Sequence, residues 1–331
     1  MSKLSLGIDT SNYKTSVAVT DENGSIVFQR SEFLEVEKGE RGLRQSIAFF
    51  KQTNAIPEFI RDVMDNVNPS DIGVVAVSDR PRRLDNSYMP VFLAGVNAAE
   101  IVSSVIGAPV YRFSHQEGHI ESVISTSNLS EPNRWIMYHL SGGTTEILLC
   151  ERNLLGFNVT EIGGTYDISF GQLLDRAGVK MGFDFPCGEK LDEIAYGSEL
   201  PIIPSRIKNV DGHFNLSGIE TEILRKVGTD GEGWDIIPGL FYRISQLLFE
   251  TAINLSKMYG IRTIFMAGGV ASSRTIRWNI SKMYDAYMEK AGPDDYTDFE
   301  IAWGDRRLSG DNAVGISLLG SRTHRNWSNY R

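Results

Sequence analysis

The sequence predicts an α/β protein in which two lobes repeat one architecture. Residues 4–27 and residues 134–153 carry this prediction, because each stretch reads as a strand, a short polar turn and a second strand. More than a hundred residues separate the two stretches, as in a duplicated fold. The 331 residues also exceed what one small core needs. We therefore expect one lobe over residues 1–130 and a second, with a helical insertion, over residues 131–331.

Helical and strand patterns fill the chain around these two stretches. In the first lobe we expect helices over 46–67 and 90–106, and strands over 72–78 and 108–114. In the second lobe we expect a strand over 261–269 and helices over 168–181, 189–196, 237–259, 273–290 and 311–322.

Composition limits the possible partners. No apolar run reaches the roughly 18 residues that span a bilayer, and the N-terminus has no signal-peptide pattern, so we expect a cytoplasmic protein without membrane contact. The two cysteines, Cys150 and Cys187, cannot build a disulfide framework. A net charge of −9 argues against a globally basic nucleic-acid surface. Any RNA contact must be local, as at the arginines of residues 79–83 or 306–307, which could equally be solvated loop charges.

His115 and His119 are candidate metal ligands. Only five histidines occur in the chain, and four-residue spacing on a helix puts both imidazoles on one face, one turn apart. Glu117 points to a different face, so this is not the HExxH pattern of zinc proteases. The alternative is a surface or hydrogen-bonded pair, and spacing alone leaves both readings open. Asp311 is the candidate third ligand, although no spacing rule links it to the pair.

Two glycine turns and two acids are candidate nucleotide contacts. The turn at residues 141–143 and the Gly268-Gly269 turn before a helix can offer backbone amides to a phosphate, or they can be purely structural. Asp175 and Asp192 flank the Pro-Cys-Gly turn at residues 186–188. They could accept hydrogen bonds from a ribose diol, or they could be solvent-facing helix acids.

Several motifs follow one another in a specific order. They are HQEGH, SGG between strands, GGTYD followed by FGQLLDR, PCG, SGIET, MAGGVASSR and GDNA. In this order, and over nearly the whole chain, they resemble the tRNA threonylcarbamoyladenosine transferases, once labelled O-sialoglycoprotein endopeptidases. The resemblance implies an actin/Hsp70-like (ASKHA) fold of two duplicated lobes around a central nucleotide cleft. It implies metal-dependent transfer of threonylcarbamoyl from its adenylate to the amine of adenosine 37 of tRNA, helped by small partner proteins.

Matched position by position, the resemblance implies two groups of site residues. His115, His119 and Asp311 correspond to the ligands of one divalent ion, Fe²⁺ or Zn²⁺. An adenine nucleotide or acyl-adenylate would contact His139, Leu140, Ser141, Gly142, Gly143, Asp175, Gly188, Asp192 and Ser273, to which the turn argument adds Gly268 and Gly269. No catalytic residue is assigned.

The chain departs from the family pattern on the acceptor side. The family's ETSCDET is here DTSNYKT, so Tyr13 and Lys14 replace two acids. Thr144 replaces the histidine of SGGH, and Ser273 replaces an asparagine. The metal-ligand pattern is thus retained while the residues expected near the acceptor differ.

Three functions follow from these observations. The first is a threonylcarbamoyltransferase acting on tRNA. The second is a paralogous carbamoyl- or acyltransferase with a non-tRNA acceptor, favoured by the acidic net charge and the lost acids. The third is a metal- and nucleotide-binding regulatory protein without turnover.

Overall fold

The protein divides into two compact units. The structure, a computed structural model, describes residues 3–11, 14–35, 43–84, 87–127, 129, 132–293, 295–305, 307–308 and 313–329. Met1–Ser127, Arg152–Phe157 and Gly310–Arg331 form unit 1, while Asn128–Glu151 and Asn158–Ser309 form unit 2. None of the helices in the described residues combines the length and apolar character that crossing a membrane requires.

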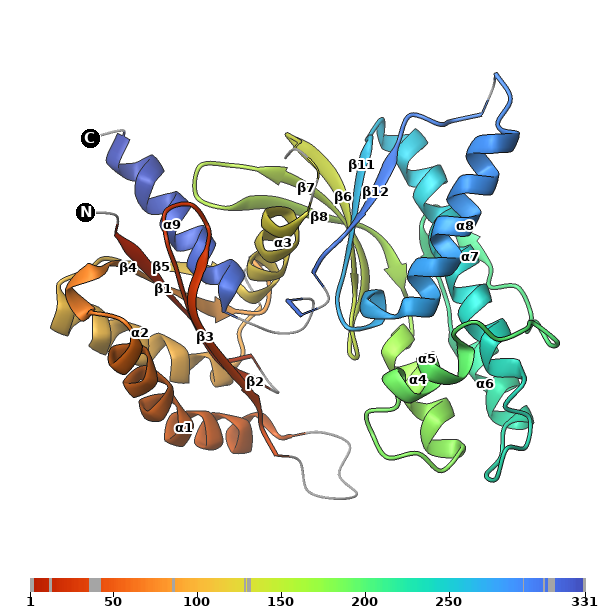
Figure 1. The fold of residues 1–331 in the computed structure, drawn as a ribbon, viewed down its shortest axis with the longest axis horizontal. Helices are drawn as coiled ribbons and strands as arrows, with labels where there is room; N and C mark the ends of the chain where they lie inside the picture. Colours follow the sequence, from red (N-terminus) through yellow and green to blue (C-terminus); the bar gives the residue numbers. More distant parts are fainter. Residues whose placement is uncertain are drawn as a thin grey trace. The chain divides into compact units, whose positions relative to one another are not determined.

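Unit 1 is built on a five-stranded mixed sheet (Figure 1). The strands are β1 (Leu4–Asp9), β2 (Lys14–Thr20), β3 (Ile26–Phe33), β4 (Ile72–Arg80) and β5 (Val110–Ser114). Their order is β3-β2-β1-β4-β5, with β1, β2 and β3 antiparallel and β1, β4 and β5 parallel. β1 and β4 consist almost entirely of buried residues, as expected for strands covered on both faces.

Helices cover both faces of this sheet (Figure 1). On one face lie α1 (Gln45–Asn66) and α2 (Leu93–Ile106), whose apolar side chains join those of β1, β2 and β4 in one core. On the other face lie α3 (His115–Thr126) and α9 (Val314–Asn329). The described elements of unit 1 thus form three layers.

The last helix, α9, belongs to unit 1. The sequence analysis expected it in the second lobe, over residues 131–331. A Cβ on Gly7 of β1 would lie 2.5 Å from the Ala313 carbonyl oxygen, and one on Gly320 would lie 2.6 Å from the Ala76 Cβ. Glycine at both positions therefore lets α9 approach the sheet closely. The Ser317 hydroxyl also donates to the Ser5 carbonyl at 2.7 Å. Apolar periodicity shows that a helix has a face to bury, but not which sheet buries it.

Unit 2 repeats the strand arrangement of unit 1. Its strands are β6 (Arg134–Leu140), β7 (Thr145–Arg152), β8 (Phe157–Thr165), β9 (Asn209–Val210), β10 (His213–Phe214), β11 (Thr263–Ala267) and β12 (Glu300–Trp303). Their order is β12-β11-β6-β7-β8-β10-β9. β6 pairs antiparallel with β7 and parallel with β11, and β11 pairs parallel with β12. In unit 1, β1 pairs antiparallel with β2 and parallel with β4, and β4 pairs parallel with β5. This repetition agrees with the duplication expected from the two β-turn-β stretches.

Two long helices and an insertion complete unit 2. The long helices are α7 (Ile236–Tyr259) and α8 (Arg274–Lys290), which pack together beside β11 and β12 (Figure 1). Between β8 and α7 the chain adds α4 (Phe170–Lys180), α5 (Gly188–Ala195) and α6 (Ser217–Lys226), together with the short strands β9 and β10. The aromatic and aliphatic side chains of α4–α8 form the largest cluster of buried residues described.

Most helices expected from periodicity are present within a few residues of their expected ends. The expected helix over 90–106 begins with a 3₁₀ turn, Pro90–Phe92, before α2. The expected helix over 311–322 runs further, to Asn329, while its expected start at Asp311 lies outside the described residues. The sequence patterns did not predict β3, β8, β9, β10, β12 or α6; β9 and β10 have two residues each, and most residues of β3 are exposed.

Candidate functional site

Three strands of unit 1 deliver polar residues to one end of the sheet. β1 ends at Asp9, β4 carries Ser78 near its end, and β5 ends at Ser114, where α3 begins. Because β1, β4 and β5 are parallel, their carboxyl ends lie at the same edge. Ligand sites of open α/β sheets form at this edge.

A hydrogen-bonded chain of three side chains occupies that edge. His115 Nδ1 lies 2.9 Å from Asp9 Oδ1, and His115 Nε2 lies 2.9 Å from His119 Nε2. The two imidazole rings meet edge to face with centroids 4.4 Å apart. Asp9 is fully buried and also accepts a hydrogen bond from the Ser78 hydroxyl. Its second oxygen, Oδ2, is buried without a hydrogen-bond partner among the described residues.

The first turn of α3 fixes the direction of both histidines. Ser114 and Glu117 form a capping box: the Ser114 hydroxyl accepts from the Glu117 amide, and Glu117 Oε2 accepts from the Ser114 amide at 2.7 Å. Glu117 Oε2 also lies 3.5 Å from Nε of Arg83. Glu117 therefore caps the start of α3 and lies near an arginine. This agrees with the expectation that it points to a different helix face than the two histidines.

The histidine pair fits a shared metal ion. Two imidazole nitrogens bound to one zinc at about 2.0–2.1 Å can be at most about 4.2 Å apart, and the two Nε2 atoms lie well within that span. In protein metal sites, a histidine that binds the ion through one ring nitrogen typically donates a hydrogen bond from the other nitrogen to a carboxylate. Asp9 is placed to accept this bond from Nδ1 of His115. Among the described residues no group of three ligand-type side chains is arranged to hold one metal ion, and Asp311 lies outside them.

In unit 2, two glycine turns meet at one end of the sheet. The turn at Ser141–Thr144 is closed by the Ser141 amide, which donates to the Thr144 carbonyl, and by the Thr144 amide, which donates to the Ser141 hydroxyl. Gly268 has φ +99°, and a Cβ there would lie 2.2 Å from the Leu140 carbonyl oxygen. Only glycine allows this approach of the β11 turn to the end of β6.

The N-terminus of α4 rests on the same turn. The Ser169 hydroxyl donates to the Gly142 carbonyl at 2.6 Å, and a Cβ on Gly171 would lie 2.3 Å from the Gly142 Cα. Gly142 and Gly143 themselves are exposed, whereas His139 and Leu140 are buried in β6. The expected phosphate-binding turn therefore sits on a fixed base with its two glycines accessible.

Asp192 and Ser273 cap helix α8 together. Asp192 Oδ1 accepts from the Ser273 hydroxyl at 2.5 Å and from the Thr275 amide at 3.0 Å, while Oδ2 accepts from the Arg274 amide at 2.9 Å. Burial alone would raise the pKa of Asp192, but these hydrogen bonds outweigh it and hold the pKa below its ordinary value. The expected ribose contact of Asp192 thus competes with a structural role that sequence reasoning did not foresee.

Asp175 and Gly188 lie on either side of a buried thiol. Asp175 Oδ1 accepts from the Cys187 amide at 2.8 Å, and burial raises the pKa of Asp175 above its ordinary value. Gly188 begins α5, and a Cβ there would meet open space. Cys187 and Cys150 are both buried free thiols. Nothing in these contacts tests the expected nucleoside binding, which stays a prediction.

Lys14, which replaces a family acid, and Arg80, in the arginine-rich segment 79–83, have partners inside unit 1. Lys14 Nζ lies 4.8 Å from the centroid of the exposed Phe33 ring. Arg80 forms two hydrogen bonds of 2.8 Å with the carboxylate of its neighbour Asp79. Tyr13 and Arg306 lie outside the described residues.

Sequence reasoning missed Asp9 and Ser78 as site residues. Asp9 reads as the first residue of a polar turn, and Ser78 as the end of a buried strand. The available clue was an acid at the carboxyl end of a strand in a parallel sheet, which often faces a ligand site.

Comparison with known proteins identifies the family. A model of the tRNA N6-adenosine threonylcarbamoyltransferase family matches residues 39–302. The enzyme of that name from Thermotoga neapolitana is 25% identical over 327 residues, which cover 95% of this chain and 92% of the relative.

Two solved structures resemble the chain in fold. HypF from T. kodakarensis has a TM-score of 0.62 at 14% identity and covers 98% of this chain, which spans 48% of HypF. The activator of 2-hydroxyisocaproyl-CoA dehydratase from Clostridium difficile, with bound ADPNP, has a TM-score of 0.52 at 16% identity, covering 100% and 98% of the two chains. These likenesses confirm the expected α/β, actin/Hsp70-like fold class. The family model matches most of the chain, which therefore belongs to the tRNA N6-adenosine threonylcarbamoyltransferase family.

Proposed function

We propose that this protein is a metal-dependent transferase that moves threonylcarbamoyl from its adenylate to the exocyclic amine of adenosine 37 of tRNA. The observation that carries the proposal is the Asp9–His115–His119 chain, in which Asp9 engages one ring nitrogen of His115 and the two Nε2 atoms converge. Family membership supplies the reaction class. Accessory proteins and a cytoplasmic site of action are part of the same proposal.

In this proposal the residues of unit 1 hold the metal. Asp9 accepts the Nδ1 proton of His115, which leaves the Nε2 lone pair available to an ion. His119 adds a second nitrogen and Asp311 the third ligand. A bound Fe²⁺ or Zn²⁺ would neutralise the phosphate of the adenylate and so favour its departure as a leaving group.

Residues of unit 2 are also proposed to bind adenylate. Gly142 and Gly143 are exposed residues on a fixed turn, and their backbone N–H groups are suited to a phosphate or acyl oxygen because such groups stabilise negative charge. Asp175, Gly188 and Asp192 would contact the nucleoside. The transfer breaks the bond between the carbamoyl carbon and the phosphate oxygen, forms a bond from that carbon to the adenosine nitrogen, and releases one amine proton and AMP.

A paralogous carbamoyl- or acyltransferase with a non-tRNA acceptor is the second candidate. It is favoured by the contact of Lys14 with Phe33, because a cation stacked on an aromatic ring stands where the family has an acid. Thr144 supports it as well, since its side chain has no imidazole where the family places a histidine.

The test combines metal analysis with tRNA modification. We expect the purified wild-type protein to contain close to one Fe²⁺ or Zn²⁺ per chain by elemental analysis, and His115→Ala to contain almost none. His213→Ala, which removes a histidine of unit 2, is the matched control and should retain the metal. In a strain depleted of the family's standard enzyme, wild type and His324→Ala, a substitution on α9 outside the proposed binding residues, should restore the threonylcarbamoylated nucleoside, and His115→Ala should not.

The outcomes separate the candidates. A wild-type protein that binds metal but restores no modified nucleoside would exclude the tRNA reaction. Purified protein that then consumes threonylcarbamoyl-adenylate with another acceptor would identify the paralogue, and a protein that binds adenylate without consuming it would be a regulatory one. Equal metal content in wild type and His115→Ala would remove the metal site.

A further inference from the structure

A basic surface pocket lies in the insertion of unit 2, and none of the proposed adenylate-binding residues line it. It has a volume of about 780 Å³ and is formed by residues 205–208 and by helix α6 with the segment before it. Four cationic side chains and one carboxylate line it: Arg206, Lys208, Arg225, Lys226 and Glu222. In a chain of net charge −9 this is a local concentration of positive charge.

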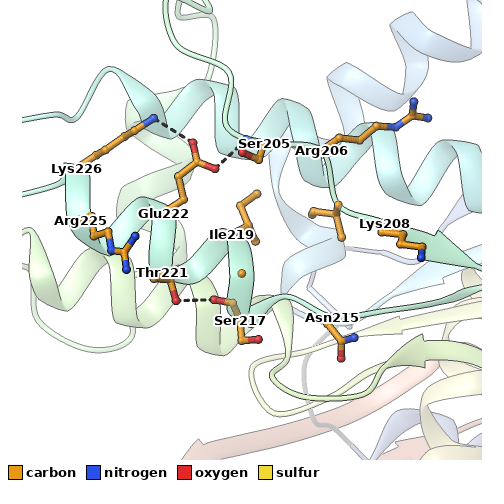
Figure 2. Close-up of a pocket in the computed structure, with 12 residues that line it drawn as sticks. Ser205, Arg206, Lys208, Asn215, Ser217, Ile219, Thr221, Glu222, Arg225 and Lys226 are labelled. Atoms are coloured by element: carbon orange, nitrogen blue, oxygen red, sulfur yellow. Dashed lines mark hydrogen bonds and ion pairs between the residues drawn. The ribbon is translucent and has the colours of Figure 1, made fainter.

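The carboxylate in this pocket, that of Glu222, already has hydrogen-bond partners within the pocket. Glu222 Oε1 accepts from Lys226 Nζ at 3.0 Å, and Oε2 accepts from the Ser205 amide at 2.9 Å (Figure 2). Burial would raise the pKa of Glu222, but these hydrogen bonds outweigh it and lower the pKa, so the group stays ionised and bound. Its role is to fasten residue 205 to α6 and so to shape the pocket.

Two cations remain available to a ligand. Arg206 pairs with Glu250 of α7 at 2.6 Å, whereas Lys208 and Arg225 have no hydrogen bond or ion pair with any described residue. Figure 2 shows Arg225 and Lys226 at one end of the pocket and Arg206 and Lys208 at the other, with Asn215, Ser217 and Thr221 along one side. Cations at both ends suit an extended polyanion better than one small anion.

An exposed aromatic stack adjoins the pocket. Tyr166 is 71% exposed and stacks on His213 with ring centroids 4.9 Å apart and planes 10° from parallel. The Tyr166 amide donates to the Phe214 carbonyl at 3.0 Å, and Asn215 of the pocket is the next residue. Asp167 holds this segment by accepting from the Leu216 and Ser217 amides at 2.8 and 3.0 Å. Accessible aromatic faces beside cations are typical of surfaces that bind unstacked bases.

We propose that this pocket, with the Tyr166–His213 stack, binds the phosphodiester backbone of the acceptor RNA. The inference rests on the proposed tRNA reaction for the identity of the RNA. Lys208 and Arg225 contact phosphates at the two ends, Asn215 and Ser217 hydrogen-bond between them, and the Tyr166 ring stacks on a base. The contact is local, which explains how an acidic protein could hold RNA.

The experiment measures binding of an unmodified tRNA transcript to the full-length protein by fluorescence anisotropy at several salt concentrations. We expect Lys208→Glu/Arg225→Glu to weaken binding at least roughly tenfold and to lower the slope of log affinity against log salt by about two. The control Lys257→Glu/Lys290→Glu makes the same charge change at exposed lysines outside the pocket and should bind nearly as wild type does. Lys208→Arg/Arg225→Lys should also retain binding.

Other outcomes overturn the proposal in identifiable ways. An equal loss of affinity for the transcript in the pocket variant and in the control variant would mean a general effect of charge. Unchanged transcript binding in the pocket variant, together with binding of inorganic phosphate by wild type but not by that variant, would mean a small-anion site. If the pocket variant binds the transcript as tightly as wild type does but fails to modify it in the presence of accessory proteins, the pocket contacts one of those proteins.

The same variants separate this inference from the proposed reaction. If wild type modifies tRNA and the pocket variant binds and modifies it equally well, the pocket proposal fails while the reaction stands. If wild type forms no modified nucleoside but binds the transcript through the pocket, the reaction fails while RNA binding stands. Metal content should be unchanged in the pocket variant.

Discussion

At the scale of single residues, Asp9 decides what His115 can do. A neutral imidazole has one N–H and one lone pair, and the partner of one nitrogen fixes the state of the other. Asp9 Oδ1 lies 2.9 Å from Nδ1 of His115, so it assigns the proton to that nitrogen and the lone pair to Nε2. Asp9 is therefore a positioning residue, because it acts through His115.

The first prediction concerns Asp9→Asn. An amide holds the imidazole proton less strongly than a carboxylate, so we expect the affinity for the divalent metal to fall roughly 10–100-fold while the fold is kept. Competition with a chelator of known affinity measures this change. Asp71→Asn, at an acid of unit 1 outside the site, is the control and should bind metal as wild type does. Equal affinities for Asp9→Asn and wild type would show that Asp9 has no part in metal binding.

At the scale of elements, helix starts position the candidate residues. Ser114 and Glu117 cap α3 and so place both histidines, while Asp192 and Ser273 cap α8 beside the Gly268–Gly269 turn. The capping box of α3 lies within four consecutive residues and follows a sequence pattern. The cap of α8 joins residues 81 positions apart, so no local pattern could reveal it.

The second prediction concerns this cap. At neutral pH, Asp192→Ala should lower the free energy of unfolding by about 1–2 kcal/mol, because three donors at the start of α8 lose their acceptor. Urea denaturation measures the difference. Asp235→Ala is the control, since Asp235 precedes α7 without capping it through its side chain, and it should cost much less.

The cap also has a pH dependence with a definite sign. Folding lowers the pKa of Asp192 below its ordinary value of 3.8, so its contribution to stability is complete above that pH. It is lost as the pH falls through the lower folded-state pKa. The difference between wild type and Asp192→Ala should therefore be constant from about pH 5 to 8 and shrink in stronger acid. A difference that grew on acidification would contradict the hydrogen bonding described for Asp192.

At the scale of the whole molecule, a metal bound between elements should stabilise the fold. His115 and His119 lie on α3, and the residue that positions His115 ends β1, so an ion there joins elements from distant parts of the chain. A ligand that binds only the folded state adds about 2.7 kcal/mol when its concentration is a hundred times its Kd.

The third prediction follows from this linkage. Removing metal with a chelator should lower the Tm of wild type and of His213→Ala by several degrees, and readdition of Fe²⁺ or Zn²⁺ should restore it. The Tm of His115→Ala should not respond to either treatment. Scanning calorimetry checks this, and a Tm of wild type that is insensitive to the chelator would argue against a structural contribution of the metal.

The sequence by itself determined the fold class, the duplicated β-turn-β units, most helices and the family. These features depend on local periodicity and on motifs that are read along the chain. Tertiary structure alone decided that α9 packs on unit 1, that Asp9 and Ser78 support His115, and that Asp192 caps α8. It also gathered Lys208 and Arg225 around one pocket. Each of these contacts joins residues through packing of elements, and contacts of that kind leave no fixed spacing in the sequence.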